Sequence, residues 1–252
     1  MYSAWKKVDD PPKRVEPVPM AILMMALTIV GITPNRQDDA VMDCIWMAFY
    51  FLLRPGEYAN ASGDTPHPFR LRDVEFKIGS LHFADVMTAT DDQLRAATYV
   101  SLTFTDQKNG VKGEKLAHCT NGQLQSCPVR AVMRRVLHLR QHNAPASTPL
   151  HTFFDLSSRK RNVTSTLVTS LLRIAALSIP GHAGVDPANI AARSLRSSGA
   201  MSLLLGGQDP DIIRVLGRWR SDAMFRYLHA QAMPLIRNNS SLMFQGSHYH
   251  LA

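Results

Sequence analysis

The sequence is poor in the features that mark secreted or membrane-spanning proteins. Its 252 residues include only three cysteines, which are Cys44, Cys119 and Cys127. Three cysteines are too few for a disulfide scaffold and favour a reducing, intracellular compartment. The longest nearly uncharged apolar stretches, Met20–Ile32 and Cys44–Leu53, are shorter than the ~18 residues that a membrane span requires. The charged N-terminus is not followed by the apolar core of a signal peptide. We therefore expect neither a secreted nor a membrane protein.

Charge is sparse overall and strongly skewed along the chain. Charged residues make up 19% and hydrophobic residues 45% of the sequence, an ordinary globular mixture, and the formal net charge is +8. The segment 151–252 holds 11 basic and 5 acidic residues, whereas the first 150 residues hold 17 and 15. Ten of the 11 late basic residues are arginines, which suit bidentate contact with phosphate. The skew favours a polyanionic partner, with nucleic acid first.

The apolar periodicity predicts an α+β fold, mostly helical with a small antiparallel sheet. Helices are predicted over Met20–Val30, Asp38–Leu53, Pro128–His142, Ser165–Leu177, Asn189–Leu205, Asp209–Leu216 and about Ser221–Leu228. The first is apolar nearly all round and is expected to be buried, and Pro55 is expected to close the second. Alternation predicts strands at Val74–Ile78 and Thr98–Thr105, the latter followed by an Asn109-Gly110 hairpin turn. Residues 1–17 are expected to be a leader or linker stub.

The common enzyme and metal motifs are missing. Cys119 and Cys127 are eight residues apart with His118 adjacent, and neither CxxC nor HExxH spacing occurs. Gly206-Gly207 lacks the following Lys-Ser/Thr of a phosphate-binding loop and is typical of a helix C-terminus. We therefore expect no metal and no cofactor.

Arginines in unusual settings are the strongest chemical signal. Arg54 ends an apolar helix in FLLRPGEY, where burial without an anionic partner is costly, and Glu57 is a candidate ion-pair partner three residues later. Arg193 and Arg196 lie one helical turn apart beside an apolar run in ARSLRSSGAMSLLL, so they are expected to share a helix face. By contrast, four arginines in Pro128–His142 are expected to form a solvated or phosphate-touching face: Arg130, Arg134, Arg135 and Arg140.

The order of these segments resembles the tyrosine recombinase (phage integrase) family. FLLRPGEY resembles the first arginine box of that family, and ARSLRSSGAMSLLLGGQDPDIIRVLGRWRSDAMFRYLH resembles its second box. The resemblance covers roughly Pro17–His229 and is closest to recombinase-like proteins of eukaryotic mobile elements. It implies a catalytic domain at residues 18–229 and a C-terminal tail at residues 230–252.

The resemblance also implies a set of functional residues. The catalytic residues are Arg54, Lys108, Arg193, Arg196, Arg218 and Tyr227, with Glu57 and Trp219 in support. In this chemistry Tyr227 attacks a DNA phosphorus and forms a 3′-phosphotyrosyl link. Arginines stabilise the charge that develops on the phosphate oxygens, and Lys108 protonates the departing 5′-oxygen.

Two positions depart from the family pattern. Arg193 occupies the histidine position of the family's H-x-x-R motif, and Arg218 falls nine residues before Tyr227, where histidine or tryptophan is usual. Three alternatives therefore stay open: a DNA-binding module that has lost cleavage, a relic reading frame of a mobile element, and a type IB topoisomerase-like activity. The expected partners are double-stranded DNA and further copies of the chain, a tetramer in the active complex, and the resemblance to eukaryotic elements implies a nuclear location.

Overall fold

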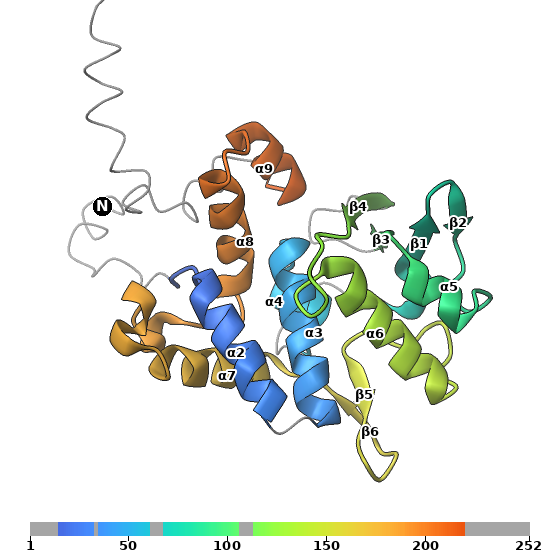
Figure 1. Ribbon diagram of the computed structural model, residues 1–252, viewed down its shortest axis with the longest axis horizontal. Helices are drawn as coiled ribbons and strands as arrows, with labels where there is room; N and C mark the ends of the chain where they lie inside the picture. Colours follow the sequence, from blue (N-terminus) through green and yellow to red (C-terminus); the bar gives the residue numbers. More distant parts are fainter. Residues whose placement is uncertain (1–14, 33–34, 61–67, 106–112, 220–252) are drawn as a thin grey trace, which may run out of the picture.

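The computed structural model describes residues 15–32, 35–60, 68–105 and 113–219, and it has an α+β architecture (Figure 1). Its α-helices are α2 (Met20–Ile32), α3 (Arg36–Tyr50), α4 (Pro55–Tyr58), α5 (Asp91–Ala96), α6 (Pro128–Gln141), α7 (Ser165–Leu177), α8 (Ser194–Leu205) and α9 (Pro210–Leu216). Short 3-10 helices are η1 (Leu71–Asp73), η2 (Pro180–Gly184) and η3 (Pro187–Asn189). No described helix is long and apolar enough to cross a membrane.

The strands form two antiparallel sheets. Four strands pair in the order β2-β1-β3-β4, and their bounds are β1 (Val74–Ile78), β2 (Leu81–Phe83), β3 (Tyr99–Phe104) and β4 (Glu114–Cys119). Val74 pairs with Leu102 and Leu102 pairs with Leu116, so one apolar row crosses three strands. Strands β5 (Thr152–Phe154) and β6 (Lys160–Asn162) form a separate hairpin.

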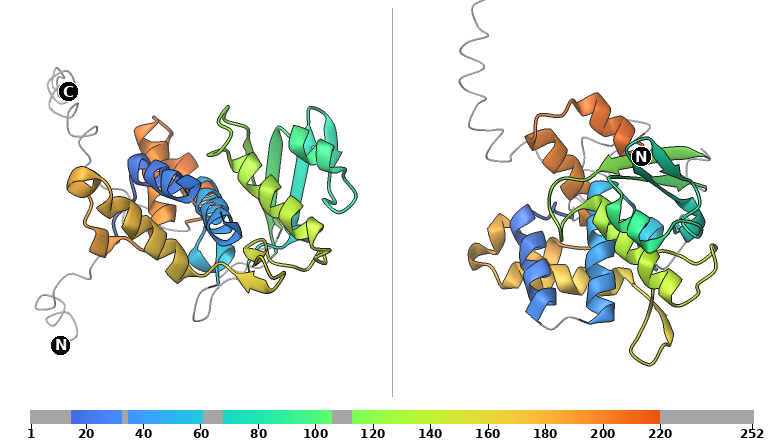
Figure 2. Two further views of the ribbon diagram at one scale, coloured as in Figure 1. Left: turned by 60° about the horizontal axis from the view of Figure 1, so that its bottom comes forward. Right: turned by 45° about the vertical axis from the view of Figure 1, so that its right-hand side comes forward.

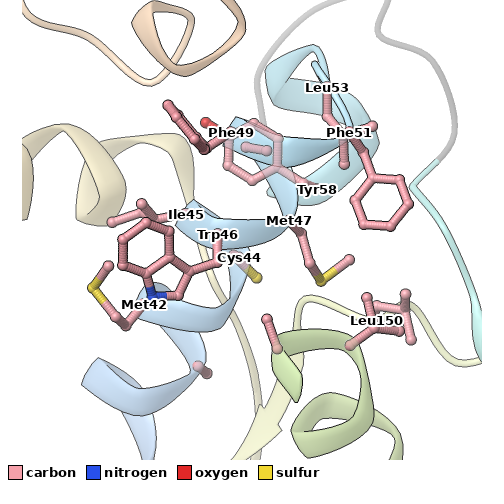
Figure 3. Packing of buried hydrophobic residues seen from close by; sticks show 14 of the residues in the cluster. Met42, Cys44, Ile45, Trp46, Met47, Phe49, Phe51, Leu53, Tyr58 and Leu150 are labelled. Atoms are coloured by element: carbon pink, nitrogen blue, oxygen red, sulfur yellow. The ribbon is translucent and has the colours of Figure 1, made fainter. Parts of the chain in front are cut away.

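Helix α3 lies at the centre of the molecule. It contacts α2, α6, α7, α8 and β5, and Figure 2 shows the four-stranded sheet on one side of it and α2 with α7 on the other. Every residue of Ala40–Phe49 is therefore buried, including Trp46, whose ring packs among the side chains of α3 (Figure 3). This central position makes the end of α3 a fixed point on which several segments converge.

The structure confirms much of the predicted element order. Strand β1 and helix α7 have the predicted bounds, and β3 pairs with β4 as the predicted hairpin requires. Helix α9 begins at Pro210 behind an Asp209 cap whose side chain accepts from the N–H groups of residues 211 and 212. The predicted helix at Ser221–Leu228 and the turn at Asn109-Gly110 lie outside the described residues.

Several predicted boundaries were wrong. Helix α3 ends at Tyr50 rather than Leu53, and Pro55 begins α4 instead of closing α3, because proline suits the first turn of a helix. The helix predicted from Asn189 begins at Ser194, after η3 and a short connection. Helix α2 is only partly buried, since its exposed residues include Met20 and Met24.

The arginines of α6 also differ from their predicted role as a solvated face. Arg135 is buried and donates to the carbonyls of Leu150 and Thr152. Arg134 pairs with the buried Asp43, with Nη2 and Oδ1 separated by 2.6 Å. Arg130 donates to the carbonyl of Arg95 in α5, and Arg140 donates to the carbonyls of Val86 and Ala89 in the loop before α5. These side chains tie α6 to neighbouring segments.

Candidate functional site

The end of α3 supplies the first part of the candidate site. The N–H of Leu53 donates to the carbonyl of Ala48 at 3.0 Å, a bond that closes the helix end. Leu52 lies between them with φ +50, in the left-handed region that glycine usually occupies. This turn leaves the carbonyls of Phe51 and Leu52 available to side chains from elsewhere, at the negative end of the helix dipole.

The end of α9 is built in a similar way. The N–H groups of Arg218 and Trp219 donate to the carbonyls of Val215 and Arg214, at 2.9 and 3.0 Å. This pair of bonds is the Schellman motif, in which the left-handed position is usually glycine. Here that position is Arg218, with φ +56. Its side chain is thereby directed toward the end of α3, where its hydrogen-bond partners lie.

A buried carboxylate joins two of the arginines. Glu57 is 1% exposed, and its Oε2 accepts from the N–H of Arg54 at 2.7 Å, at the start of α4. Its Oε1 pairs with Nη1 of Arg54 and its Oε2 with Nη2 of Arg218, each at 3.2 Å. Burial lowers the pKa of Arg218 from its ordinary value, and the charge of Glu57 opposes that shift. The ion pair expected between Arg54 and Glu57 is therefore present and is shared with a third residue.

The guanidinium of Arg218 is enclosed by protein. Nη1 donates to the carbonyls of Phe51 and Leu216, both at 3.3 Å, and Nη2 donates to the carbonyl of Leu52 at 3.1 Å. Its central carbon lies 4.0 Å from the ring centre of Phe104, at the end of β3. The side chain is 3% exposed. Arg218 thus connects the ends of α3, α9 and β3.

Arg196 bridges the same two helix ends from α8. Its Nη1 donates to the carbonyl of Leu52 at 3.2 Å, and its Nη2 donates to the carbonyl of Gly217. The Trp219 ring covers the guanidinium, with its centre 4.5 Å from the central carbon. A Cβ atom at Gly217 would overlap the Trp219 indole, so this stacking requires glycine there. Arg196 is 4% exposed.

Close packing of α8 brings Arg196 into reach. A Cβ atom at Gly199 would overlap the carbonyl oxygen of Phe49, so α8 approaches the last turn of α3 at a distance that only glycine permits. The hydroxyl of Tyr58, in α4, donates to the carbonyl of Ala192 at 2.9 Å and ties α4 to the segment before α8.

The structure therefore brings together Arg54, Glu57, Arg196, Arg218 and Trp219. Arg193 lies apart from this buried group: it is the exposed N-cap residue of α8, whereas Arg196 one turn later faces inward. Lys108 and Tyr227 lie outside the described residues. The three guanidinium groups outnumber the carboxylates of Glu57 and of Glu114, whose charge also acts on Arg218, and the excess of positive charge suits an anionic group such as a phosphodiester.

Some members of this group have no recognisable signal in the sequence. The carbonyls of Phe51 and Leu52 are backbone atoms, and their role depends on a left-handed turn that leucine does not signal. Phe104 is one apolar position in an alternating strand and looks like ordinary core. Among the described residues, no three His, Cys, Asp or Glu side chains are grouped as metal ligands.

In fold, the chain is similar to solved structures. No protein-family model and no curated protein matches the chain. A solved XerA recombinase structure is similar at 12% sequence identity with a TM-score of 0.47, covering 97% of this chain and 68% of that chain.

Proposed function

We propose that this chain is a DNA strand-transferring enzyme of the tyrosine recombinase type, with double-stranded DNA as its substrate. The observation that carries the proposal is the convergence of Arg54, Arg196 and Arg218 around Glu57 and two helix ends. These arginines come from three different segments of the chain, and they are three of the four arginines that the recombinase resemblance places in the active site; the fourth, Arg193, is exposed and lies apart.

The chemistry assigns each group one step. Tyr227 attacks phosphorus, the bond to the 5′-oxygen breaks, and a 3′-phosphotyrosyl link conserves the energy of the broken bond. Arg54 and Arg196 stabilise the charge on the non-bridging oxygens. Lys108 gives its proton to the leaving 5′-oxygen. A 5′-hydroxyl from another strand then attacks the link and releases Tyr227.

The two arginines differ in how they meet a phosphate. The Arg54 side chain is 25% exposed and is therefore partly accessible from solvent. Arg196 is covered by Trp219, so contact with a phosphate requires the indole to move off the guanidinium. Because each copy of the chain contains one Tyr227, exchange between two duplexes requires several copies on DNA. The relation to eukaryotic mobile elements and the nuclear location belong to this same proposal.

A second candidate function is a DNA-binding module without cleavage. Two observations favour it: Arg193 stands at the histidine position and is exposed, and Arg196 is enclosed. Such a module would bind duplex DNA with a strong dependence on salt and would never become covalently attached.

A covalent-trapping assay tests the proposal. The protein and its Tyr227→Phe variant are incubated at low salt with nicked duplex oligonucleotides of varied sequence and then separated on a denaturing gel. We expect an adduct from the wild type that is absent from the variant, because only the tyrosine hydroxyl can form the link. Binding in a gel shift without any adduct would support the DNA-binding module instead.

A further inference from the structure

We infer that Arg218 is a positioning residue that sets the spacing of Arg54 and Arg196, and that it does not itself contact the phosphate. This inference rests on the proposed function and refines it. The resemblance placed Arg218 among the catalytic residues, at a position where the family usually has histidine or tryptophan, whereas in this structure its terminal nitrogens donate to three backbone carbonyls and to Glu57.

The donors on the terminal nitrogens of Arg218 already face protein acceptors. A guanidinium has four N–H groups on its two terminal nitrogens. Nη1 of Arg218 faces two carbonyl acceptors, and Nη2 faces one carbonyl and Oε2 of Glu57, with all four distances between 3.1 and 3.3 Å. A phosphate oxygen could bind a terminal nitrogen only by displacing one of these buried acceptors. Leaving such an acceptor unsatisfied is costly, more so for a carboxylate.

Arg218 shares hydrogen-bond acceptors with both Arg54 and Arg196. Arg218 and Arg54 both pair with Glu57, and Arg218 and Arg196 both donate to the carbonyl of Leu52. Arg218 is thus one hydrogen-bond acceptor away from each arginine that is proposed to hold the phosphate. Its removal would loosen the spacing between them, although Arg54 and Arg196 themselves remain.

The backbone conformation of Arg218 also favours a positioning role. Arg218 stands in the left-handed position of a Schellman motif, where glycine is usual and other residues are strained. From this position its guanidinium stacks on Phe104 and reaches the end of α3. The strain is compensated by this set of contacts, which fix the end of α9 against β3 and α3.

The salt dependence of DNA binding separates positioning from phosphate contact. Each phosphate contact by a cationic side chain contributes about one to the slope of log K against log salt concentration for duplex DNA. Binding of a fluorescein-labelled nicked duplex is measured between low and moderate salt for wild type, Arg218→Gly, Arg218→Lys and Arg54→Ala. Glycine removes the side chain while suiting the left-handed backbone, and lysine keeps the charge but cannot bridge four acceptors.

We expect Arg54→Ala to lower the magnitude of the slope by about one, and both Arg218 variants to keep the wild-type slope. At saturating DNA, both Arg218 variants should form the covalent adduct at least about tenfold more slowly than wild type, because the phosphate-holding groups are misplaced. Lysine should not rescue this rate, since positioning depends on the planar fork of arginine and not on its charge.

Three results would overturn the inference. One is a slope reduced by about one in Arg218→Gly and restored in Arg218→Lys, which would make Arg218 a phosphate ligand. The second is a wild-type adduct rate in both variants. The third is the absence of duplex binding by wild type, which would reject the proposed function itself. If wild type binds but forms no adduct, the slopes alone decide whether Arg218 contacts phosphate.

Thermal unfolding checks that each variant is folded at the assay temperature. Glu57→Gln provides a second, independent variant, because it removes the charge that Arg218 and Arg54 share while leaving both arginines in place. Positioning predicts a slower adduct rate for Glu57→Gln and a combined effect with Arg218→Lys that is less than additive. Fully additive effects in the double variant would contradict the shared network.

Discussion

Two groups of arginines that bond to other parts of the protein differ in what they connect. The arginines of α6 each tie that helix to neighbouring segments, such as Arg135 to the carbonyls of Leu150 and Thr152. Those around Glu57 come from separate parts of the chain and meet at one carboxylate and two helix ends. An enclosed arginine is therefore not by itself evidence of a phosphate site. Convergence of several arginines from distant segments is the informative feature.

The buried carboxylates of the two groups differ in the exposure of their arginine partners. Asp43 is paired with Arg134, whose side chain is 37% exposed, whereas Glu57 is paired with the 3% exposed side chain of Arg218 as well as with Arg54. Burial raises the pKa of Asp43, although the charge of Arg134 opposes the shift. The charged form of Asp43 is therefore less favoured by its surroundings, and its removal should matter less.

The largest expected effect follows from removing these charges. Glu57→Gln should lower the free energy of unfolding by about 3–5 kcal/mol, because it leaves the enclosed guanidinium of Arg218 without its anion. Asp43→Asn should cost about 1 kcal/mol or less, since water already solvates much of Arg134. Urea denaturation of the two variants measures both values. Equal losses would show that the Glu57 group is an ordinary ion pair.

The second prediction concerns pH on the α6 side of the comparison. Burial, reinforced by the charge of Arg135, lowers the pKa of His138 and of His151 to about 4. The Nε2 atom of His138 also accepts a hydrogen bond from the N–H of Phe154 at 2.9 Å, which requires an unprotonated nitrogen. At these two histidines the unfolded chain therefore binds more protons than the folded chain between pH 6.5 and 4. Their contribution to the free energy of unfolding falls as the pH is lowered through this window.

For His151, which is 5% exposed, this linkage corresponds to about 3 kcal/mol between pH 6.5 and pH 4. His138 should add less because solvent reaches it. Unfolding of wild type and of a His138→Gln, His151→Gln double variant is followed over this range, and their difference removes the contribution of the other titrating groups. The free energy of unfolding of wild type should decrease relative to that of the double variant as the pH falls. A pH-independent difference would contradict the lowered pKa values.

The third and smallest effect tests how closely α8 approaches α3. Gly199→Ala should destabilise the fold by about 1–3 kcal/mol, because the new methyl group overlaps a backbone carbonyl that cannot move aside alone. Gly31→Ala, at the end of α2, is the matched control, since no atom lies within 4 Å of its added Cβ. Thermal unfolding compares them. A loss in the control as large as that in Gly199→Ala would remove the packing argument.

The fold could be predicted from sequence wherever the signal was local. Strand β1 alternates, α7 is amphipathic, and the Asp209-Pro210 pair marks the start of α9. Strand β6 could not be predicted, because its residues Lys160–Asn162 are all exposed and carry no apolar alternation. The short hairpin to which it belongs is defined by pairing with β5, which no local pattern records.

The candidate site could likewise be predicted only where its contacts are local in sequence. The pairing of Arg54 with Glu57 follows from their spacing of three residues and is present in the structure. The approach of Arg218 to Glu57 depends on two left-handed turns, and that of Arg196 to the end of α3 depends on a glycine contact between α8 and α3. None of these features has a signature in a single sequence. The arginines of α6 were predicted to be solvated because their carbonyl acceptors lie in other segments of the chain, which no local pattern records.

The most direct test of the account compares one arginine from each group. Arg54 and Arg134 both pair with a buried carboxylate, and both keep part of the side chain exposed. The rate of covalent adduct formation on a nicked duplex is measured for Arg54→Ala and for Arg134→Ala under single-turnover conditions. We predict a loss of at least about 100-fold for Arg54→Ala, because a group that stabilises the transition state is removed, and a near wild-type rate for Arg134→Ala. Equal rates in the two variants would contradict the assignment of the Glu57 group as the phosphate-binding site.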